Sequence, residues 1–412
     1  MSFDVARVRG LYVTLSDGWT YLNAHDCPQI PEKVSAGVAT AFRLSPKMEA
    51  REPTGGTHSR VAASGTLVGE GYVEAARRAL ADLAGVQPRQ VILGPDRHAL
   101  MRTLVQAMSG RLKASSTIIA SRGEDPTLLR PLRTTEAQFL FAEPDLGTGQ
   151  LPAEQFTRLI TGATRLVFIP AAHAYVGAVT DVKAIAATVH ERSRAWVVVD
   201  ASAYAPYRPI DIENWGADMV LVDCAALGGP DIAALILRDE SMFLRLTQLN
   251  QEAQPRTPQA LEPNRLSTGL LGGVAPAIDH LAGLGGLSRG TRRTRLRASM
   301  KELEGYMDDL THQLVEHLMA LPGVHVVGAS GETGQKNLDR VPRVTFALPG
   351  VPAPTIHQRM IDNGIVATVS PRCPLLDSMG VEEAGGSVTV GLGPFNTPFD
   401  IWQLTRAVAS LA

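Results

Sequence analysis

The middle of the chain alternates short apolar runs with segments of helical periodicity. The runs occur at 91–94, 116–121, 137–143, 165–170, 195–200, 218–223 and 233–238. Within the segment 181–193, which separates two runs, Val182, Ile185, Ala186 and Val189 fall on one helical face. Continuous apolar runs separated by helices are typical of parallel strands that are buried on both faces. The pattern therefore predicts an α/β fold with helices on both faces of a mainly parallel sheet.

The pattern changes after residue 285. The glycine-rich segment 281–290 predicts a hinge or connection, and a long polar–apolar helix is expected from Thr291 to Leu321. The runs HVVG, RVTFAL and SVTVGL then alternate as antiparallel strands do. We expect a smaller α+β domain in this part of the chain.

Composition and charge narrow the class of protein. The chain has 412 residues, 45% of them hydrophobic, and a formal net charge of -2, so nothing favours binding to nucleic acid or to an anionic membrane. It has no apolar signal core and no run long enough to span a bilayer, and its three cysteines are too few for a disulfide framework. We therefore expect a cytoplasmic protein. His58 and His173 lack partners at metal-ligand spacing, so no metal is predicted.

Two apolar runs are joined by the segment 223–235, which reads DCAALGGPDIAAL. This pattern predicts a strand, a glycine-rich turn and a returning strand. Asp200 ends another run, AWVVVD. Because ligands of open α/β sheets bind beyond the carboxyl ends of strands, Asp200 is at a favourable position for chemistry.

Several stretches carry a resemblance to a known family and keep the order of that family. They are YLNAHDCPQIP (21–31), RLVFIPAAHAYVGAVTDVKAIAATVHE (165–191), AWVVVDASAYAPYRPIDIENWGADMVLVD (195–223), GGP (228–230) and GGSVTVGLGPFNTPFDIWQL (385–404). Together they resemble the class V aminotransferases and cysteine desulfurases, which are fold-type I pyridoxal phosphate (PLP) enzymes. The nearest likeness is to an actinobacterial branch of aminotransferase-like proteins. The resemblance implies a large PLP-type domain over residues 20–285, a small domain from 1–19 and 286–412, and a homodimer with shared active sites.

The resemblance assigns central roles in cofactor binding to positions 200 and 226. Asp200 matches the aspartate that pairs with the pyridinium nitrogen and keeps the ring electron-withdrawing; a cap for the next turn is the alternative. The Schiff-base lysine of the family falls at Ala226, three residues before Gly229 and Pro230. Alanine can neither form an imine nor move a proton. The six lysines of the chain lie elsewhere, at Lys33, Lys47, Lys113, Lys183, Lys301 and Lys336.

The positions that the resemblance assigns to phosphate binding have changed. Asp223 stands where the family usually has serine, and its charge would repel a phosphate. Arg97 and His98 stand at a helix start where the family has a small or hydroxyl residue. Asn264 and Arg265 match the Gly-Thr that the partner subunit lends. These residues either form a new anion site or mark the loss of the old one.

The positions assigned to the cofactor ring and the substrate have changed as well. The stacking histidine falls at Asp125, the asparagine of the SNxxG motif at Ala174, and the residue that contacts the cofactor hydroxyl at Ala203. The arginine that clamps a substrate carboxylate falls at Thr389, which cannot offer a bidentate fork. Loss of the whole set points away from ordinary transamination.

Cysteine and arginine provide two further candidates. Cys373 lies nine residues after Gly364, which is the spacing of the catalytic cysteine in the family's desulfurases, and Arg372 is expected to lower its pKa. A coincidental loop cysteine is the alternative. The arginine-rich run 289–297 is interpreted as the solvated start of the long helix, with a site for an anionic partner as the alternative.

Three functions remain open. The first is a degenerate homologue, or pseudoenzyme, which keeps the fold without lysine-dependent PLP catalysis and binds a protein partner or a different small anion. The second is an enzyme that holds PLP non-covalently and uses another base, such as His98. The third is a genuine aminotransferase in which a distant lysine reaches the cofactor.

Overall fold

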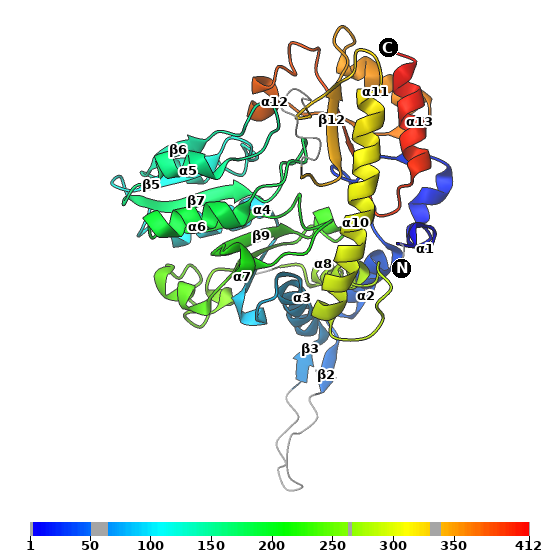
Figure 1. Ribbon diagram of the computed structural model, residues 1–412. Coiled ribbons are helices and arrows are strands. Elements are labelled where there is room, and N and C mark those ends of the chain that lie inside the picture. The colour runs from blue at the N-terminus through cyan, green and yellow to red at the C-terminus, as the bar shows by residue number, and fades with distance from the viewer. Residues whose placement is uncertain (1–2, 51–64, 263–265, 330–338, 412) are drawn as a thin grey trace.

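A seven-stranded sheet dominates the computed structural model, which describes residues 3–50, 65–262, 266–329 and 339–411 (Figure 1). The strand order is β4-β10-β9-β8-β7-β5-β6. The strands are β4 (Val91–Gly94), β5 (Thr117–Ser121), β6 (Gln138–Ala142), β7 (Thr164–Pro170), β8 (Trp196–Asp200), β9 (Met219–Asp223) and β10 (Ala233–Leu237). Strands β5 to β9 pair in parallel, and β10 runs antiparallel to both of its neighbours. The prediction of a mainly parallel α/β sheet is confirmed.

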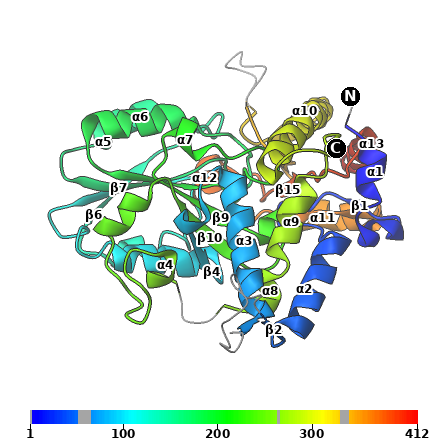
Figure 2. The same ribbon diagram turned by 90° about the horizontal axis from the view of Figure 1, so that it is seen from below.

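Helices cover both faces of this sheet (Figure 2). The helices of this region are α3 (Val68–Ala84), α4 (Arg97–Ala107), α5 (Ala153–Leu159), α6 (Val182–Arg192) and α7 (Ile212–Trp215). Along β8, Val197 and Val199 pack in the same core as α3 and α6, whereas Trp196 and Val198 pack in the core of α4. Because every side chain of β8 is buried, its sequence is a continuous apolar run and does not alternate.

The turn between β9 and β10 is the returning connection that the sequence predicted. Ala233 pairs with Asp223 in an antiparallel register. A short 3-10 helix, Ala225–Leu227, is followed by Gly228 with a φ of 72°. A Cβ at Gly228 would lie 2.8 Å from the carbonyl oxygen of Gln29, so the turn needs glycine both for its backbone angle and for space.

A four-stranded antiparallel sheet, of order β11-β12-β15-β14, organises the C-terminal part of the chain. Its elements are β11 (His325–Val326), β12 (Arg343–Ala347), α11 (Ala353–Asp362), β14 (Thr368–Val369), α12 (Pro374–Ser378), β15 (Val388–Gly391) and α13 (Pro398–Ala409). Close to the N-terminus, β1 (Thr20–Tyr21) pairs with β13 (Ile365–Val366), so both ends of the chain meet here (Figure 1). The antiparallel strands predicted for this part are confirmed.

Further helices and strands lie outside these two sheets, and β2 and β3 among them form a separate two-stranded sheet. They are α1 (Val5–Arg9), α2 (Glu32–Leu44), β2 (Met48–Ala50), β3 (Gly65–Leu67), α8 (Thr268–Leu271), α9 (Val274–Leu281) and α10 (Arg292–Met319). In α10, Leu296, Met300, Leu303 and Met307 are buried at steps of three or four residues, as expected for one helical face. No helix in the described parts of the chain is long and apolar enough to cross a membrane.

Two arginines at the start of α10 are structural. Arg292 lies 2.9 Å from both Asp82 and Asp279, measured between guanidinium nitrogen and carboxylate oxygen. Arg293 donates to the backbone carbonyls of Asp82 and Leu83, near the C-terminal end of α3. These contacts satisfy carbonyls that have no partner within α3. The interpretation of this run as merely solvated is wrong for these two side chains, because they fix α10 to α3.

Candidate active site

A cavity of about 580 Å³ lies at the carboxyl ends of the parallel strands. Asp200 and Asp223, which end β8 and β9, contribute to its lining, and Arg97 joins them from the start of α4. Arg343 of β12 and Cys373 line it from the C-terminal part of the chain. The cavity therefore lies where open α/β sheets place their ligands.

Most positions assigned through the resemblance meet in this cavity. Those that line it are Arg97, Asp125, Ala174, Asp200, Ala203, Asp223, Ala226, Arg372 and Cys373. His98 and Thr389 are not among the lining residues. Asn264 and Arg265 lie outside the described residues.

The Asp200 carboxylate, which is 5% exposed, already has a full set of partners. Arg97 donates from Nη1 to Oδ2 at 2.6 Å, and Ser202 donates to Oδ1 from its backbone nitrogen at 2.9 Å and from Oγ at 2.6 Å. Nε of Arg97 also lies 3.3 Å from Oδ2 of Asp223. The charge of Asp200 raises the pKa of Arg97, so the guanidinium is a permanent cation between two carboxylates. A pyridinium ring would have to compete with Arg97 for Asp200.

Glu124 is a buried acid in the same cavity that the sequence patterns did not single out. Its side chain accepts a hydrogen bond from the backbone nitrogen of Asp125 at 3.0 Å, and Oε2 has no partner among the described residues. Burial, and then the charge of Asp200, raises the pKa of Glu124 well above its usual value of 4.5. Glu124 therefore keeps its proton to a higher pH than an exposed glutamate does. It lies in the polar stretch RGEDPTLLRP, so only the fold reveals its burial.

The residues present do not fit PLP bound through a Schiff base. Ala226 lines the cavity from the turn between β9 and β10, and no lysine is among the lining residues that the structure describes. Asp200 is paired with Arg97. Asp223, at the position assigned to phosphate binding, is a carboxylate whose pKa is raised by burial, against the opposing effect of Arg97. Ala226 disfavours the imine, the pairing of Asp200 disfavours binding of the ring nitrogen, and Asp223 disfavours binding of the phosphate.

Cys373 is the N-cap residue of α12 and is 8% exposed. Burial raises the pKa of its thiol, although hydrogen bonds from the backbone of Leu376 and Leu375 oppose that shift. Arg372 is largely exposed and pairs with Glu382. The expectation that Arg372 lowers the pKa of Cys373 is therefore wrong, because burial is the larger effect and the guanidinium pairs elsewhere.

His98 and Thr389 have other structural partners. Nε2 of His98 lies 2.8 Å from Oγ1 of Thr127. Thr389 is fully buried, and its hydroxyl lies 2.8 Å from the hydroxyls of both Thr345 and Ser370. Neither side chain is among the residues that line the cavity, although Thr127, the partner of His98, is. Within the described chain, no group of three or more His, Cys, Asp or Glu residues is arranged to hold a metal ion.

A second set of lining residues carries a positive charge that sequence reasoning missed. Arg343 is 5% exposed, donates from Nη1 to the carbonyl oxygen of Ala174 at 3.0 Å, and has no partner for Nε within the described chain. His25 and His173 also line the cavity. Burial, and then the charge of Arg343, lowers the pKa of His25 to about 3 and of His173 to about 4. Both imidazoles are therefore neutral at pH 7, and Arg343 is the cation of this group.

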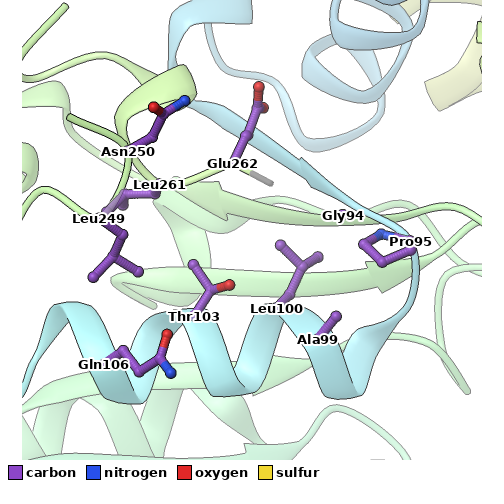
Figure 3. A pocket seen from close by; sticks show the side chains of 10 residues that line it. All are labelled: Gly94, Pro95, Ala99, Leu100, Thr103, Gln106, Leu249, Asn250, Leu261 and Glu262. Atoms are coloured by element: carbon purple, nitrogen blue, oxygen red, sulfur yellow. The ribbon is translucent and has the colours of Figure 1, made fainter. Parts of the chain in front are cut away.

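A smaller hollow of about 270 Å³ lies between α4 and the segment 249–262 (Figure 3). Leu100 and Thr103 of α4 face Leu249 and Leu261 across it. Its acidic residue, Glu262, is already bound by Arg77 at 2.7 Å. This hollow offers few groups for chemistry, so the larger cavity is the candidate active site.

Comparison with known proteins identifies the family. The model of the family described as "Aminotransferase class-V" matches residues 52–404. An uncharacterized protein of Mycobacterium tuberculosis is 39% identical over 415 residues, and the match covers 100% of both chains. The cysteine desulfurase CsdA of Escherichia coli superposes with a TM-score of 0.79 at 19% identity, over 100% of this chain and 98% of the other. A lysine-to-alanine variant of C-DES, with glycine covalently linked to its PLP cofactor, gives a TM-score of 0.76 at 15% identity, over 97% of this chain and 98% of the other. With the fold-type I architecture, the cavity at the strand ends and a family match over most of its length, the chain belongs to the class V aminotransferase family.

Proposed function

We propose that this protein is a degenerate member of its family that lacks lysine-dependent PLP catalysis and binds a different small anion in the ancestral cavity. The proposal rests on two changes observed together, alanine at position 226 and an arginine paired with Asp200. Ala226 removes the amine that would form the imine, and Arg97 supplies Asp200 with an internal cation at 2.6 Å. One change removes the covalent bond to the cofactor, and the other occupies the carboxylate that would hold its ring.

Electrostatics around the ancestral phosphate position supports the same proposal. A phosphate monoester carries nearly two negative charges at pH 7. Asp223, Asp200 and Glu124 surround Arg97, so that one cation already faces three carboxyl groups. Asp96, the N-cap of α4, uses its own carboxylate to accept from the backbone nitrogen of Ala99 at 2.7 Å. The start of α4 therefore already carries an anion, where a phosphate would otherwise be stabilised.

Non-covalent binding of PLP is the alternative. PLP is the cofactor expected from the family, and Asp200 is retained. The C-DES variant combines a lysine-to-alanine change with bound PLP, so the two are compatible in that protein. This alternative requires a replacement base within the cavity. His98 is not among the lining residues, and His173 and Glu124 are the candidates that line it.

Absorbance spectroscopy separates these functions. The purified protein is titrated with PLP, excess cofactor is removed by gel filtration, and the spectrum is recorded beside that of a lysine-bearing class V enzyme. We expect no retained chromophore. A retained aldehyde-type spectrum would instead support non-covalent binding, and Asp200→Asn should then weaken retention by about 10-fold, the loss of one charged hydrogen bond. An aldimine band would refute the proposal and identify a lysine that reaches the cavity.

A further inference from the structure

Arg343 is a buried cation in the cavity wall with no carboxylate partner among the described residues. The hydrogen bond from its Nη1 to the backbone of Ala174 satisfies one of its donors, whereas Nε has none. The Tyr207 ring lies 5.9 Å from the guanidinium carbon. Burial of an unpaired charge is costly, and most buried charges are paired or bind an ion. The described residues around Arg343 therefore provide no anion to balance its charge.

The other buried arginines show how this protein usually satisfies such a charge. Arg77 lies 2.7 Å from Glu262, and Arg208 lies 2.7 Å from Asp339. Arg340 has no carboxylate partner within the described chain, but it donates to two backbone carbonyls and does not line the cavity. Arg343 differs because it lines the cavity and has no carboxylate partner among the described residues. Its side chain contributes to the cavity wall, so a ligand in the cavity would lie beside this unpaired charge.

Two neutral histidines, His173 and His25, line the cavity together with Arg343. In His173, Nδ1 accepts from the backbone nitrogens of Tyr175 and Val176 at 3.2 and 3.0 Å, so the ring proton resides on Nε2. Gly391 of β15 pairs with Arg343 of β12. The His25 ring packs against this glycine, so closely that a Cβ added at Gly391 would lie 2.7 Å from Nδ1 of His25. Neither ring nitrogen of His25 has a partner within the described chain. The imidazoles add hydrogen-bonding groups without adding charge.

Arg97 does not serve the same role. It is held by Asp200 at 2.6 Å and by Asp223 at 3.3 Å, so its charge is already offset inside the protein. The Thr389 hydroxyl is buried and already hydrogen-bonded to the hydroxyls of Thr345 and Ser370. Among the lining arginines, Arg343 is therefore the one without a carboxylate partner in the described chain.

We infer that the cavity binds a small organic carboxylate through Arg343, with His173 and His25 as hydrogen-bonding partners; this assignment rests on the proposed function and specifies its ligand. A guanidinium matches the planar, singly charged carboxylate in both geometry and charge. A phosphate carries nearly two charges and would leave one uncompensated beside the carboxyl groups of Glu124 and Asp125, which also line the cavity. One guanidinium without a carboxylate partner among the described residues thus favours the singly charged carboxylate.

Ligand titration of the PLP-free, full-length protein tests this inference. Acetate, acetamide and inorganic phosphate are titrated separately, and binding is followed by ligand-observed NMR and by the shift in thermal unfolding midpoint. We expect acetate to bind and to raise the midpoint, phosphate to bind more weakly, and the neutral isostere acetamide to do neither. Arg343→Met should weaken acetate binding by about 10-fold or more, because hydrogen bonds to charged groups contribute most of such an interaction. Arg158→Met, which alters an exposed arginine of α5 that does not line the cavity, should leave acetate binding unchanged.

A second variant covers the case in which Arg343→Met fails to fold. His173→Asn keeps an acceptor for the two backbone donors and removes the Nε2–H group, so we expect about 3-fold to 10-fold weaker acetate binding. Unchanged acetate binding in a folded Arg343→Met protein overturns the inference, as does equal binding of acetamide. Tighter binding of phosphate than of acetate overturns the choice of carboxylate. No acetate binding together with no retained PLP refutes this inference alone, whereas an aldimine band refutes the proposed function.

Discussion

Arg97 links two strand ends through one side chain. Its guanidinium contacts Asp200 of β8 and Asp223 of β9, and the carboxylate of Asp200 is nearly inaccessible to solvent. The position assigned by resemblance to phosphate binding has thus become a counterion for the carboxylate assigned to the ring. The two changes are coupled through space, although the residues lie more than a hundred positions apart in the chain.

Substitution of Arg97 should therefore affect folding. Arg97→Met leaves Asp200 buried without its cation, and we expect a loss of about 3–5 kcal/mol in the free energy of unfolding, measured by urea denaturation. Arg97→Lys, which retains the charge, should lose less. Combining Arg97→Met with Asp200→Asn should restore part of the loss, because the unpaired charge is then absent. An unchanged urea midpoint for Arg97→Met would show that the pair has no structural importance.

The raised pKa of Glu124 predicts that the free energy of unfolding falls as pH rises. Its pKa in the folded protein lies above the usual value of 4.5, so between these two values the folded state binds more protons than the unfolded state. The free energy of unfolding should therefore fall as pH rises through this window, by up to about 1.4 kcal/mol per pH unit from this group. Glu124→Gln, which remains neutral, should remove this slope and become relatively more stable as pH rises. Parallel stability–pH profiles of the two proteins would contradict the prediction.

The local sequence pattern predicted the helices and strands better than it predicted the contacts between them. Strands β4, β5, β8 and β10 were predicted because their side chains are buried on both faces, which leaves a continuous apolar run. The long helix α10 was predicted within a few residues of its ends because its apolar positions repeat every three or four residues. The roles of Arg292 and Arg293 were not predicted, because their partners come from α3 and α9 and no local pattern encodes such a contact.

Arg293 gives a test at the scale of the elements. Its guanidinium donates to carbonyls of α3 and to the carbonyl of Ile210 at 3.1 Å. Arg293→Ala should lower the free energy of unfolding by about 1–3 kcal/mol, because buried acceptors lose their donors. Arg297→Gln, an exposed substitution on the same helix, should change it by less than about 0.5 kcal/mol. Chemical denaturation of both variants checks the difference, and equal losses would argue against a specific contact between α10 and α3.

For the molecule as a whole, the resemblance implies a homodimer. Exposed apolar side chains are consistent with it: Phe42 of α2, Met48 of β2 and Leu67 of β3 are 57%, 59% and 43% exposed, and Met48 pairs with Leu67 across the two strands. Apolar side chains gathered on a surface are typical of an interaction site.

Light scattering after size exclusion tests the oligomeric state. We expect the mass of a dimer for the natural sequence and dissociation for Phe42→Glu, because a charge buried in an interface is unfavourable. Phe399→Glu changes a side chain of α13 that is 60% exposed and should leave the dimer intact. A monomeric natural protein, or dissociation by Phe399→Glu alone, would contradict this expectation.

The sequence by itself determined the α/β class, the family and the absence of lysine at position 226, because these depend on local periodicity and on motifs that remain in order along the chain. Only the tertiary structure decided which charges meet. It paired Arg97 with Asp200, buried Glu124 and paired Arg372 with Glu382, and among the described residues it left Arg343 without a carboxylate partner. The physical reason is that electrostatic energy depends on distance and burial, and the fold sets both by bringing together residues that are remote in sequence.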